Sequence, residues 1–246
     1  MFIRLLPRVV FSFIFLLLIA NPGAAPAQTY DWISGAGPEG GAVFDLAEAP
    51  NGDLYAALWF FGGVYRSTDG GVNWEEAGLQ GYAVSELVIN GAGDVFAAGW
   101  NTRVYRLAHG ATQWESLGND LVENFGSLAY DPDLDILYAA RWGKVSRSLD
   151  SGDNWEQVST NFPESNVHAL AVVPNGGPLF AGTDPDKVYR SIDGGVTWNP
   201  FDTGFPANGT RDLLVVPEGD VYAATYGGHV AVAPWDGAEW KHLSTG

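Results

Sequence analysis

The sequence contains no cysteine among its 246 residues. This absence excludes disulfide bonds, a cysteine nucleophile and lipid attachment at a cysteine. The stability of the folded chain must therefore come from buried side chains, for which 10 Trp, 10 Tyr and 13 Phe are available.

Basic residues are scarce as well, since 12 Lys and Arg stand against 29 Asp and Glu, a net charge of −17. A surface of this charge repels nucleic acid and anionic membranes, so neither is expected as a partner. The sequence also lacks a D-x-[DN]-x-[DN]-G calcium loop, an H-E-x-x-H pattern, a glycine-rich phosphate loop and a G-x-S-x-G elbow. We therefore predict no cofactor and no metal site.

Only one long apolar run occurs, and it lies near the N-terminus. Arg4 and Arg8 stand before or at the start of this run, and the small residues of Ala25–Ala27 follow it, which is the order of a secretory signal peptide. The run is short for a membrane span. We predict a signal peptide over residues 1–27 and a secreted domain, extracellular or periplasmic, over residues 28–246. That domain has 10 basic and 29 acidic residues, a net charge of −19.

The rest of the sequence is a repeat of about 41 residues. Its tryptophans recur at intervals of 40, 41, 43 and 42 residues, at Trp74, Trp114, Trp155, Trp198 and Trp240. Each interval holds four short segments rich in β-branched and aromatic residues and bounded by Gly, Pro, Asn or Asp, which are strand and turn signals. This pattern predicts an all-β fold, a β-propeller of five four-stranded blades. The predicted units are residues 43–82, 83–124, 125–166, 167–209 and 210–246.

Three repeats share the motif S-x-D-x-G-x-x-W between their third and fourth segments: STDGGVNW, SLDSGDNW and SIDGGVTW. The motif resembles the Asp-box, or BNR repeat, of sialidases, xyloglucanases, sortilin-type receptors and photosystem assembly factors. Two further repeats, LAHGATQW and APWDGAEW, are degenerate, with His109 and Trp235 at the aspartate place.

We interpret the box residues as structural. The aspartate can accept hydrogen bonds from N–H groups of the turn, the glycine can adopt a positive φ, and the tryptophan can pack against the sheet. These residues are Ser67, Asp69, Gly71 and Trp74, then Ser148, Asp150, Gly152 and Trp155, then Ser191, Asp193, Gly195 and Trp198.

The second predicted strands end, and the first predicted strands begin, at the same end of neighbouring strands. The resemblance places this end opposite the Asp-boxes, around the mouth of a central channel. The residues predicted to bind a ligand there are Trp59, Trp100, Trp142, Asp184, Tyr226, His168 and Arg211. Flat rings with neighbouring hydrogen-bonding groups suit sugar rings, an extended peptide or an aromatic ligand. Packing between blades is the alternative for the tryptophans, because they share one repeat position.

Three carboxylates near the mouth, Asp45, Glu86 and Asp212, are candidates for a glycosidase pair. Solvated surface carboxylates are the alternative interpretation. Sialidases carry an Arg-Ile-Pro signature, which is absent here. The opening YDWISGAGPEGGAVFDLA resembles that of xyloglucanase-type propellers, but these carry an aspartate where this sequence has Trp59 and its neighbours.

We therefore expect a secreted, non-catalytic propeller that binds a glycan or an extracellular protein through the face opposite the Asp-boxes. The alternatives are a divergent glycoside hydrolase and a module of a larger scaffold, which would self-associate if its ring is open. The N-terminal YDWISG resembles a further fourth strand, since Trp32 precedes Trp74 by 42 residues. This strand would either cap an edge or belong to a longer array.

Overall fold

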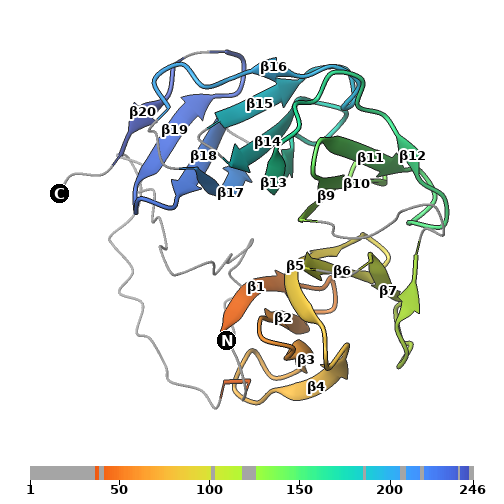
Figure 1. Ribbon diagram of the computed structural model, residues 1–246. Helices are drawn as coiled ribbons and strands as arrows, with labels where there is room; N and C mark the ends of the chain where they lie inside the picture. Colours follow the sequence, from red (N-terminus) through yellow and green to blue (C-terminus); the bar gives the residue numbers. More distant parts are fainter. Residues whose placement is uncertain are drawn as a thin grey trace.

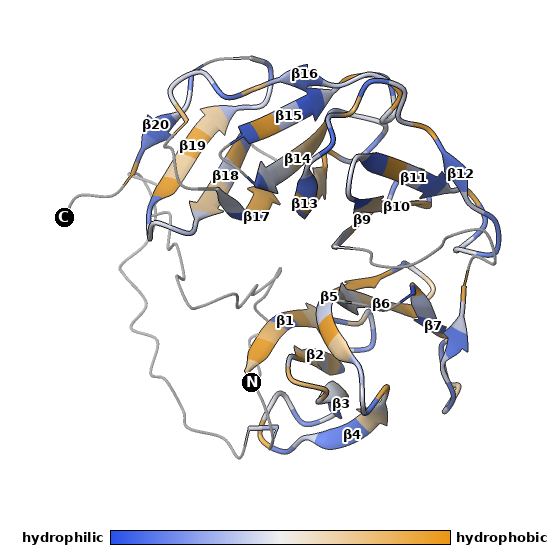
Figure 2. Cartoon of the chain, viewed as in Figure 1, coloured by the Kyte–Doolittle hydropathy of each residue, from blue (hydrophilic) through white to orange (hydrophobic). Residues whose placement is uncertain are grey.

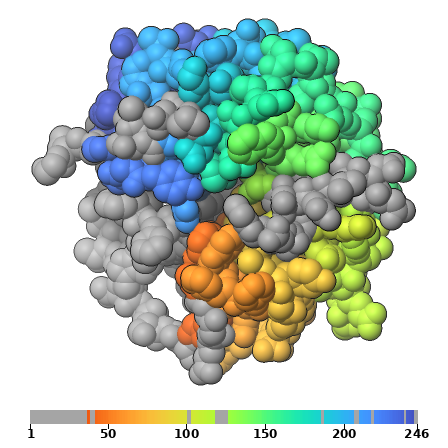
Figure 3. Space-filling model, in the orientation of Figure 1, coloured from red at the N-terminus to blue at the C-terminus, as the bar shows by residue number. Residues whose placement is uncertain are grey.

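The chain folds into five four-stranded antiparallel sheets that stand as blades around a centre (Figure 1). The computed structural model describes residues 37–38, 42–100, 103–117, 126–184, 187–205, 209–216, 219–237 and 239–243, with the side chain of Trp100 outside the description. The predicted all-β propeller of five blades is thus confirmed, while the predicted signal peptide and YDWISG strand lie outside the described residues. In the space-filling view the blades follow one another around the ring from orange through green to blue (Figure 3).

Blade 1 consists of β1 (Val43–Glu48), β2 (Leu54–Leu58), β3 (Gly63–Ser67) and β4 (Glu75–Gly78). Blade 2 consists of β5 (Ala83–Ile89), β6 (Val95–Trp100), β7 (Tyr105–Leu107) and β8 (Glu115–Ser116). Blade 3 consists of β9 (Ser127–Asp131), β10 (Ile136–Arg141), β11 (Lys144–Ser148) and β12 (Glu156–Gln157). Blade 4 consists of β13 (Asn166–Val172), β14 (Leu179–Asp184), β15 (Lys187–Ser191) and β16 (Asn199–Pro200). Blade 5 consists of β17 (Thr210–Val215), β18 (Asp220–Thr225), β19 (Val230–Pro234) and β20 (Lys241–His242).

The strands at the rim of the ring are the most exposed. The first strands β1, β5, β9, β13 and β17 lie innermost, and each of the first four contacts the first strand of the next blade. The outermost strands β4, β8, β12, β16 and β20 are short and largely exposed, and most of them are hydrophilic in Figure 2. The described residues contain no helix, and therefore none that is long and apolar enough to cross a membrane.

Four of the five first strands contain a β-bulge at the same repeat place. The strand register shifts by one residue at Phe44, Ser85, His168 and Arg211, so each of these is an extra residue relative to the second strand. A bulge re-aims the extra side chain relative to the alternating pattern of the strand. In blade 3 this place is Gly126, where a Cβ atom would lie 2.3 Å from the backbone oxygen of Val167.

The hydrophobic core is divided among the blade junctions. Four clusters of buried residues join blade 1 to blade 2, blade 2 to blade 3, blade 3 to blade 4 and blade 4 to blade 5. Among the described residues no such cluster joins blade 5 to blade 1. We call this last junction the seam.

The side of each blade that faces the next blade carries matching residues. An aromatic residue on the second strand and a valine on the third strand, or directly before it in blade 2, recur as Tyr55 and Val64, Phe96 and Val104, Tyr138 and Val145, Phe180 and Val188, and Tyr222 and Val230. The first four pairs are buried, with at most 7% of any side chain exposed. In blade 5, Tyr222 and Val230 are partly exposed, and Leu214 on the same side is 40% exposed. The seam is thus less packed than the other junctions within the described residues.

Candidate functional site

The three Asp-boxes form the same hydrogen-bonded turn between the third and fourth strands. In the first box, Asp69 Oδ1 accepts hydrogen bonds from the Asn73 N–H (2.9 Å) and the Ser67 hydroxyl (2.8 Å), and the Gly71 N–H donates to Ser67 Oγ (2.9 Å). The bonds from Asn73, followed by that from Ser67, lower the pKa of Asp69 to about 2. The two other boxes repeat these contacts.

The box tryptophans donate their indole N–H groups to backbone oxygens. Trp74, Trp155 and Trp198 donate to the glycine of their own box, at 3.1, 2.8 and 2.8 Å. In the degenerate boxes the indoles reach the preceding blade instead, because Trp114 donates to Ala77 O (2.8 Å) and Trp240 to Phe201 O (2.6 Å). The box side chains are thus engaged in turns and junctions, at the end of the third strand that lies away from the mouth.

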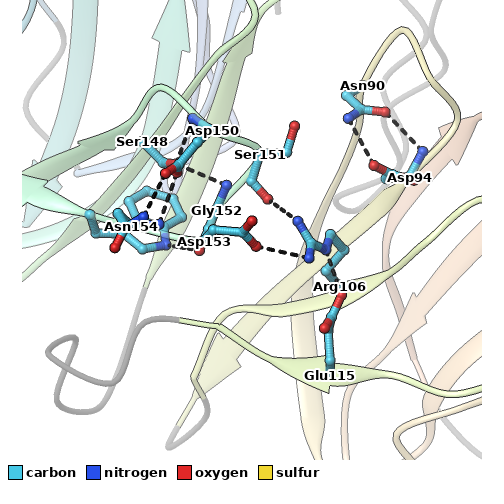
Figure 4. A network of polar contacts seen from close by, with 11 residues as sticks. Asn90, Asp94, Arg106, Glu115, Ser148, Asp150, Ser151, Gly152, Asp153 and Asn154 are labelled. Atoms are coloured by element: carbon cyan, nitrogen blue, oxygen red, sulfur yellow. Dashed lines mark hydrogen bonds and ion pairs between the residues drawn. The ribbon is translucent and has the colours of Figure 1, made fainter.

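Arg106 on the third strand of blade 2 links that blade to the box of blade 3 (Figure 4). Arg106 of blade 2 pairs with Glu115 of its own blade at 2.6 Å. It also pairs with Asp153 of blade 3 at 2.9 Å and donates to Ser151 O at 2.8 Å. The guanidinium therefore satisfies a backbone oxygen and two carboxylates at one junction.

Blade 4 has a similar arginine contact to blade 5, but blade 5 has no arginine at the matching position. Arg190 of blade 4 donates from Nη1 to Trp235 O of blade 5 at 2.8 Å. Blade 5 itself has Val232 at the arginine place. Among the described residues, a link from a third-strand arginine to the box of the next blade is therefore absent at the seam.

A continuous chain of ring contacts crosses the seam at the mouth. Trp59 stacks on Phe44, with ring centroids 4.8 Å apart and planes at 17°. The guanidinium carbon of Arg211 lies 5.1 Å from the Phe44 centroid and 5.2 Å from the Tyr226 centroid, and Nη1 donates to the Tyr226 hydroxyl at 3.4 Å. Tyr226 in turn meets the ring of His168 edge-on at 5.8 Å. The arginine therefore lies against two aromatic rings from opposite sides of the seam.

His168 connects this chain to a carboxylate. Its Nδ1 lies 3.5 Å from the Tyr226 hydroxyl, and its Nε2 lies 3.9 Å from Asp184 Oδ2. The Nε2 atom is buried and forms no hydrogen bond within the described residues. Burial lowers the pKa of His168, an effect that Asp184 opposes and Arg211 reinforces. A neutral imidazole is therefore favoured at neutral pH.

The structure brings together five of the seven residues predicted to bind a ligand: Trp59, Arg211, Tyr226, His168 and Asp184. We call these five residues together with Phe44 the mouth cluster. Trp142, in the turn after β10 of blade 3, is 57% exposed and lies outside this cluster. The position of Trp100 at the end of β6 is described, but its side chain is not.

The bulges explain how the mouth cluster forms. Phe44, His168 and Arg211 are the extra residues at the bulges of three first strands. Trp59 and Tyr226 directly follow second strands, at the same end of their sheets. Phe44 was not among the predicted binding residues, although it has the same repeat place as His168 and Arg211. That shared place is the sequence signal for it.

The candidate catalytic residue Asp45 lies inside a blade junction. Its Oδ1 accepts the Leu46 N–H at 2.8 Å, and its Oδ2 accepts the Leu87 N–H of the next blade at 2.7 Å. The residue is only 6% exposed. Asp45 therefore bridges the first strands of blades 1 and 2.

Asp212 has the matching place in blade 5, where the seam follows. Its Oδ1 accepts the Leu213 N–H at 2.8 Å. Burial raises the pKa of Asp212 to about 6, although the Leu213 N–H and Arg211 both act to lower it. Glu86, the third candidate, has this place in blade 2 and is partly exposed. The three carboxylates thus belong to three different blades.

Sequence reasoning missed two exposed aromatic residues beside the mouth cluster. Phe60 and Phe61 follow Trp59 in the turn between β2 and β3, and they are 69% and 68% exposed. Tyr82, which precedes β5, is 41% exposed. The signal for the two phenylalanines was their place in a turn, where polar residues or glycine are usual.

A family model for the BNR/Asp-box repeat matches residues 65–76, which contain the first box. The chain is a β-propeller that carries a BNR/Asp-box repeat. Its resemblance to Asp-box propellers is therefore confirmed. No curated protein sequence matches this propeller.

Two solved structures show the same fold. A structure of YCF48 bound to D1 peptide has a TM-score of 0.66 and 18% identity, and the match covers 92% of this chain and 75% of that chain. The GH74 enzyme of Niastella koreensis has a TM-score of 0.60 and 15% identity, and the match covers 81% of this chain and 30% of the enzyme chain. At these identities the similarity demonstrates the fold alone.

Proposed function

We propose that this propeller is a secreted, non-catalytic binding protein that holds an extended polypeptide segment of a protein partner at its mouth. The observation that carries the proposal is the placement of Arg211 against Phe44 and Tyr226, at 5.1 and 5.2 Å from the two ring centroids. An arginine positioned by aromatic rings combines a cationic edge with apolar faces, and arginine and aromatic residues are enriched where proteins bind proteins.

A polypeptide suits the mouth cluster better than a sugar does. One face of Trp59 is already covered by Phe44, so the ring is not open on both sides. The neighbouring Phe60 and Phe61 are exposed and carry no hydrogen-bonding group for hydroxyls. YCF48, whose solved structure has a bound D1 peptide, shares the fold over 92% of this chain. Secretion is part of the proposal and rests on the signal-peptide pattern of residues 1–27.

The test uses short random peptides displayed on phage and selected on the purified protein. We expect selected peptides to lose at least about tenfold in affinity with Arg211→Ala or Tyr226→Ala. Trp142→Ala, an exposed tryptophan outside the mouth cluster, serves as the matched control. Peptides that bind wild type and the Arg211→Ala variant equally would contradict the proposal. Saturable binding of a glycan, lost with Trp59→Ala and accompanied by no peptide binding, would replace the polypeptide by a sugar.

One observation favours glycoside hydrolysis as a second candidate function. A carboxyl group with its pKa raised to about 6, as for Asp212, can act as a general acid near neutral pH. Release of sugars from a panel of polysaccharides, abolished by Asp212→Asn, would support this candidate. Product release that persists in Asp212→Asn would exclude Asp212 as its acid.

A further inference from the structure

The turn between β2 and β3 presents two phenylalanines to solvent. Phe60 and Phe61 are 69% and 68% exposed, more than any other aromatic residue among the exposed ones of the described chain, which are Tyr82, Trp142 and Tyr226. Adjacent exposed rings of this size form an apolar patch, and such patches mark interaction sites more often than single exposed residues do. The turn starts at Trp59, which belongs to the mouth cluster.

The backbone conformation of the two phenylalanines is costly. Their φ angles are 57° and 66°, in the left-handed region that glycine and asparagine tolerate and that bulky residues rarely adopt. Two successive residues with positive φ are characteristic of a type I′ turn, for which Asn-Gly is the favoured pair. A sequence selected for stability alone would therefore not place Phe-Phe here.

The turn is fixed in position by backbone contacts. Phe61 O accepts the Gly81 N–H at 2.8 Å, and the Gly63 N–H donates to Tyr82 O at 3.2 Å. Gly63 itself has φ 69°, and a Cβ atom there would lie 2.5 Å from the backbone of Leu79. The two rings are thus presented by a preorganised backbone, which reduces the entropy lost on binding.

The matching turns of other blades adopt positive φ with glycine. In blade 3 the residue is Gly143, with φ 65°, and in blade 5 it is Gly228, with φ 77°. Blade 1 differs from these two, because its turn holds four residues between the paired Leu58 and Gly63 and includes two exposed aromatic residues with positive φ.

We infer that the Phe60–Phe61 turn is an apolar anchor that packs against leucine, isoleucine, methionine or aromatic side chains of the polypeptide partner. This inference rests on the proposed function, because it assigns the anchor to the same ligand as the mouth cluster. Rigid aromatic anchors at the edge of a polar site are typical of binding hot spots.

A lipid surface fits this turn less well. Peripheral membrane proteins combine apolar anchors with Lys and Arg, which attract anionic headgroups. This chain has 12 basic against 29 acidic residues, and its net charge of −17 opposes approach to such a surface. The charge instead favours a partner that is neutral or basic outside its apolar segment.

The experiment replaces the two phenylalanines by Asn-Gly, the pair of residues that a turn with two positive φ angles favours. The variant Phe60→Asn/Phe61→Gly removes both rings and relieves the left-handed strain, so we expect its melting temperature to equal or exceed that of wild type. Peptides selected from phage on wild-type protein should bind this variant at least about thirtyfold more weakly. The matched control is Ile192→Asn, which removes a 71% exposed apolar side chain in an Asp-box turn and should leave peptide affinity unchanged.

The outcomes separate this inference from the proposed function. If selected peptides depend on Arg211 but bind the Asn-Gly variant as tightly as wild type, the anchor is wrong and the proposed function stands. If peptide binding requires the two phenylalanines but not Arg211, the inferred role of Phe60 and Phe61 is supported and the mouth cluster is not the binding site. Failure to select any peptide would overturn both. Phe-dependent binding to phosphatidylcholine vesicles with no peptide bound would assign the anchor to lipid and overturn the inference.

Discussion

The junction between blades 1 and 2 and the seam are built from matching residues in different surroundings. Tyr55, Val64 and Asp45 are buried against blade 2, and Asp45 accepts an N–H from its first strand. Tyr222 and Val230, at the corresponding places in blade 5, are partly exposed. The comparison shows that the burial of a repeat residue, and so its contribution to stability, depends on the neighbouring blade. This is expected for a repeat protein that is stabilised by the interfaces between its repeats.

The seam is also where the mouth cluster lies. Arg211 comes from blade 5 and Phe44 from blade 1, so the ring contact between them crosses the least packed junction of the described residues. Binding elements are often found in the less stable parts of a fold, because they must adjust to a ligand. Four comparisons of variants test how far the two regions differ.

The largest difference is expected for the matched tyrosines. Tyr55→Ala should lower the free energy of unfolding by about 4 kcal/mol, because a fully packed ring is lost and a cavity remains. Tyr222→Ala should lower it by about 1 kcal/mol, because part of its ring already contacts solvent. Denaturant unfolding of both variants provides the measurement, and equal losses would show that the seam is as well packed as the first junction.

The matched aspartates should differ next. Asp45→Ala leaves the Leu46 and Leu87 N–H groups without their acceptor, and we expect a loss of about 3 kcal/mol. Asp212→Ala removes the acceptor of the Leu213 N–H alone among the described residues, so its loss near neutral pH should be under about 1 kcal/mol. A smaller effect for Asp45 than for Asp212 in chemical denaturation would refute the bridging role of Asp45.

The pH dependence of Asp212 gives a third test. Because its folded-state pKa is raised from 3.8 to about 6, the folded state binds the proton more tightly, and this contribution to stability is lost as the pH rises through that range. Asp212→Asn should therefore be more stable than wild type by about 3 kcal/mol above pH 6 and equally stable below pH 3.8. Unfolding curves across this range check the prediction, which fails if the difference between the proteins does not change with pH.

The arginine links should produce the smallest difference. Arg106→Val removes two ion pairs and a bond to Ser151 O, and we expect a loss of about 1 kcal/mol that shrinks at high salt. Val232→Arg at the matching place of the seam should leave stability unchanged within about 0.5 kcal/mol. Thermal unfolding at low and high salt measures both variants. A clear stabilisation by Val232→Arg would indicate that a carboxylate or backbone oxygen faces it across the seam.

The fold was predictable because local signals agree in each repeat. The tryptophan spacing, the S-x-D-x-G-x-x-W motif and the four short apolar segments all indicated four-stranded blades, and five such blades form. The seam was not predictable from these signals. Tyr222 and Tyr55 have similar neighbours in sequence, and only the adjacent blade makes their burial different.

The candidate site was predictable in part for the same reason. Strand ends placed Trp59 and Tyr226 at the mouth, and the structure joins them through Phe44 and Arg211. The conformation of Phe60 could not be derived, because its aromatic side chain favours a strand and the left-handed turn opposes that preference.

The bulge of the first strand has an evolutionary consequence. Ser85, His168, Arg211 and Phe44 are chemically unlike one another, yet each is an extra residue relative to the second strand, and the residues on either side of each keep the same register. A substitution of a bulge residue can change the side chain presented at the mouth. The strand pairing, the Asp-box and the junction of that blade remain unchanged. In four blades one bulge position can therefore vary without a new fold, and the specificity of the proposed binding at the mouth can evolve there.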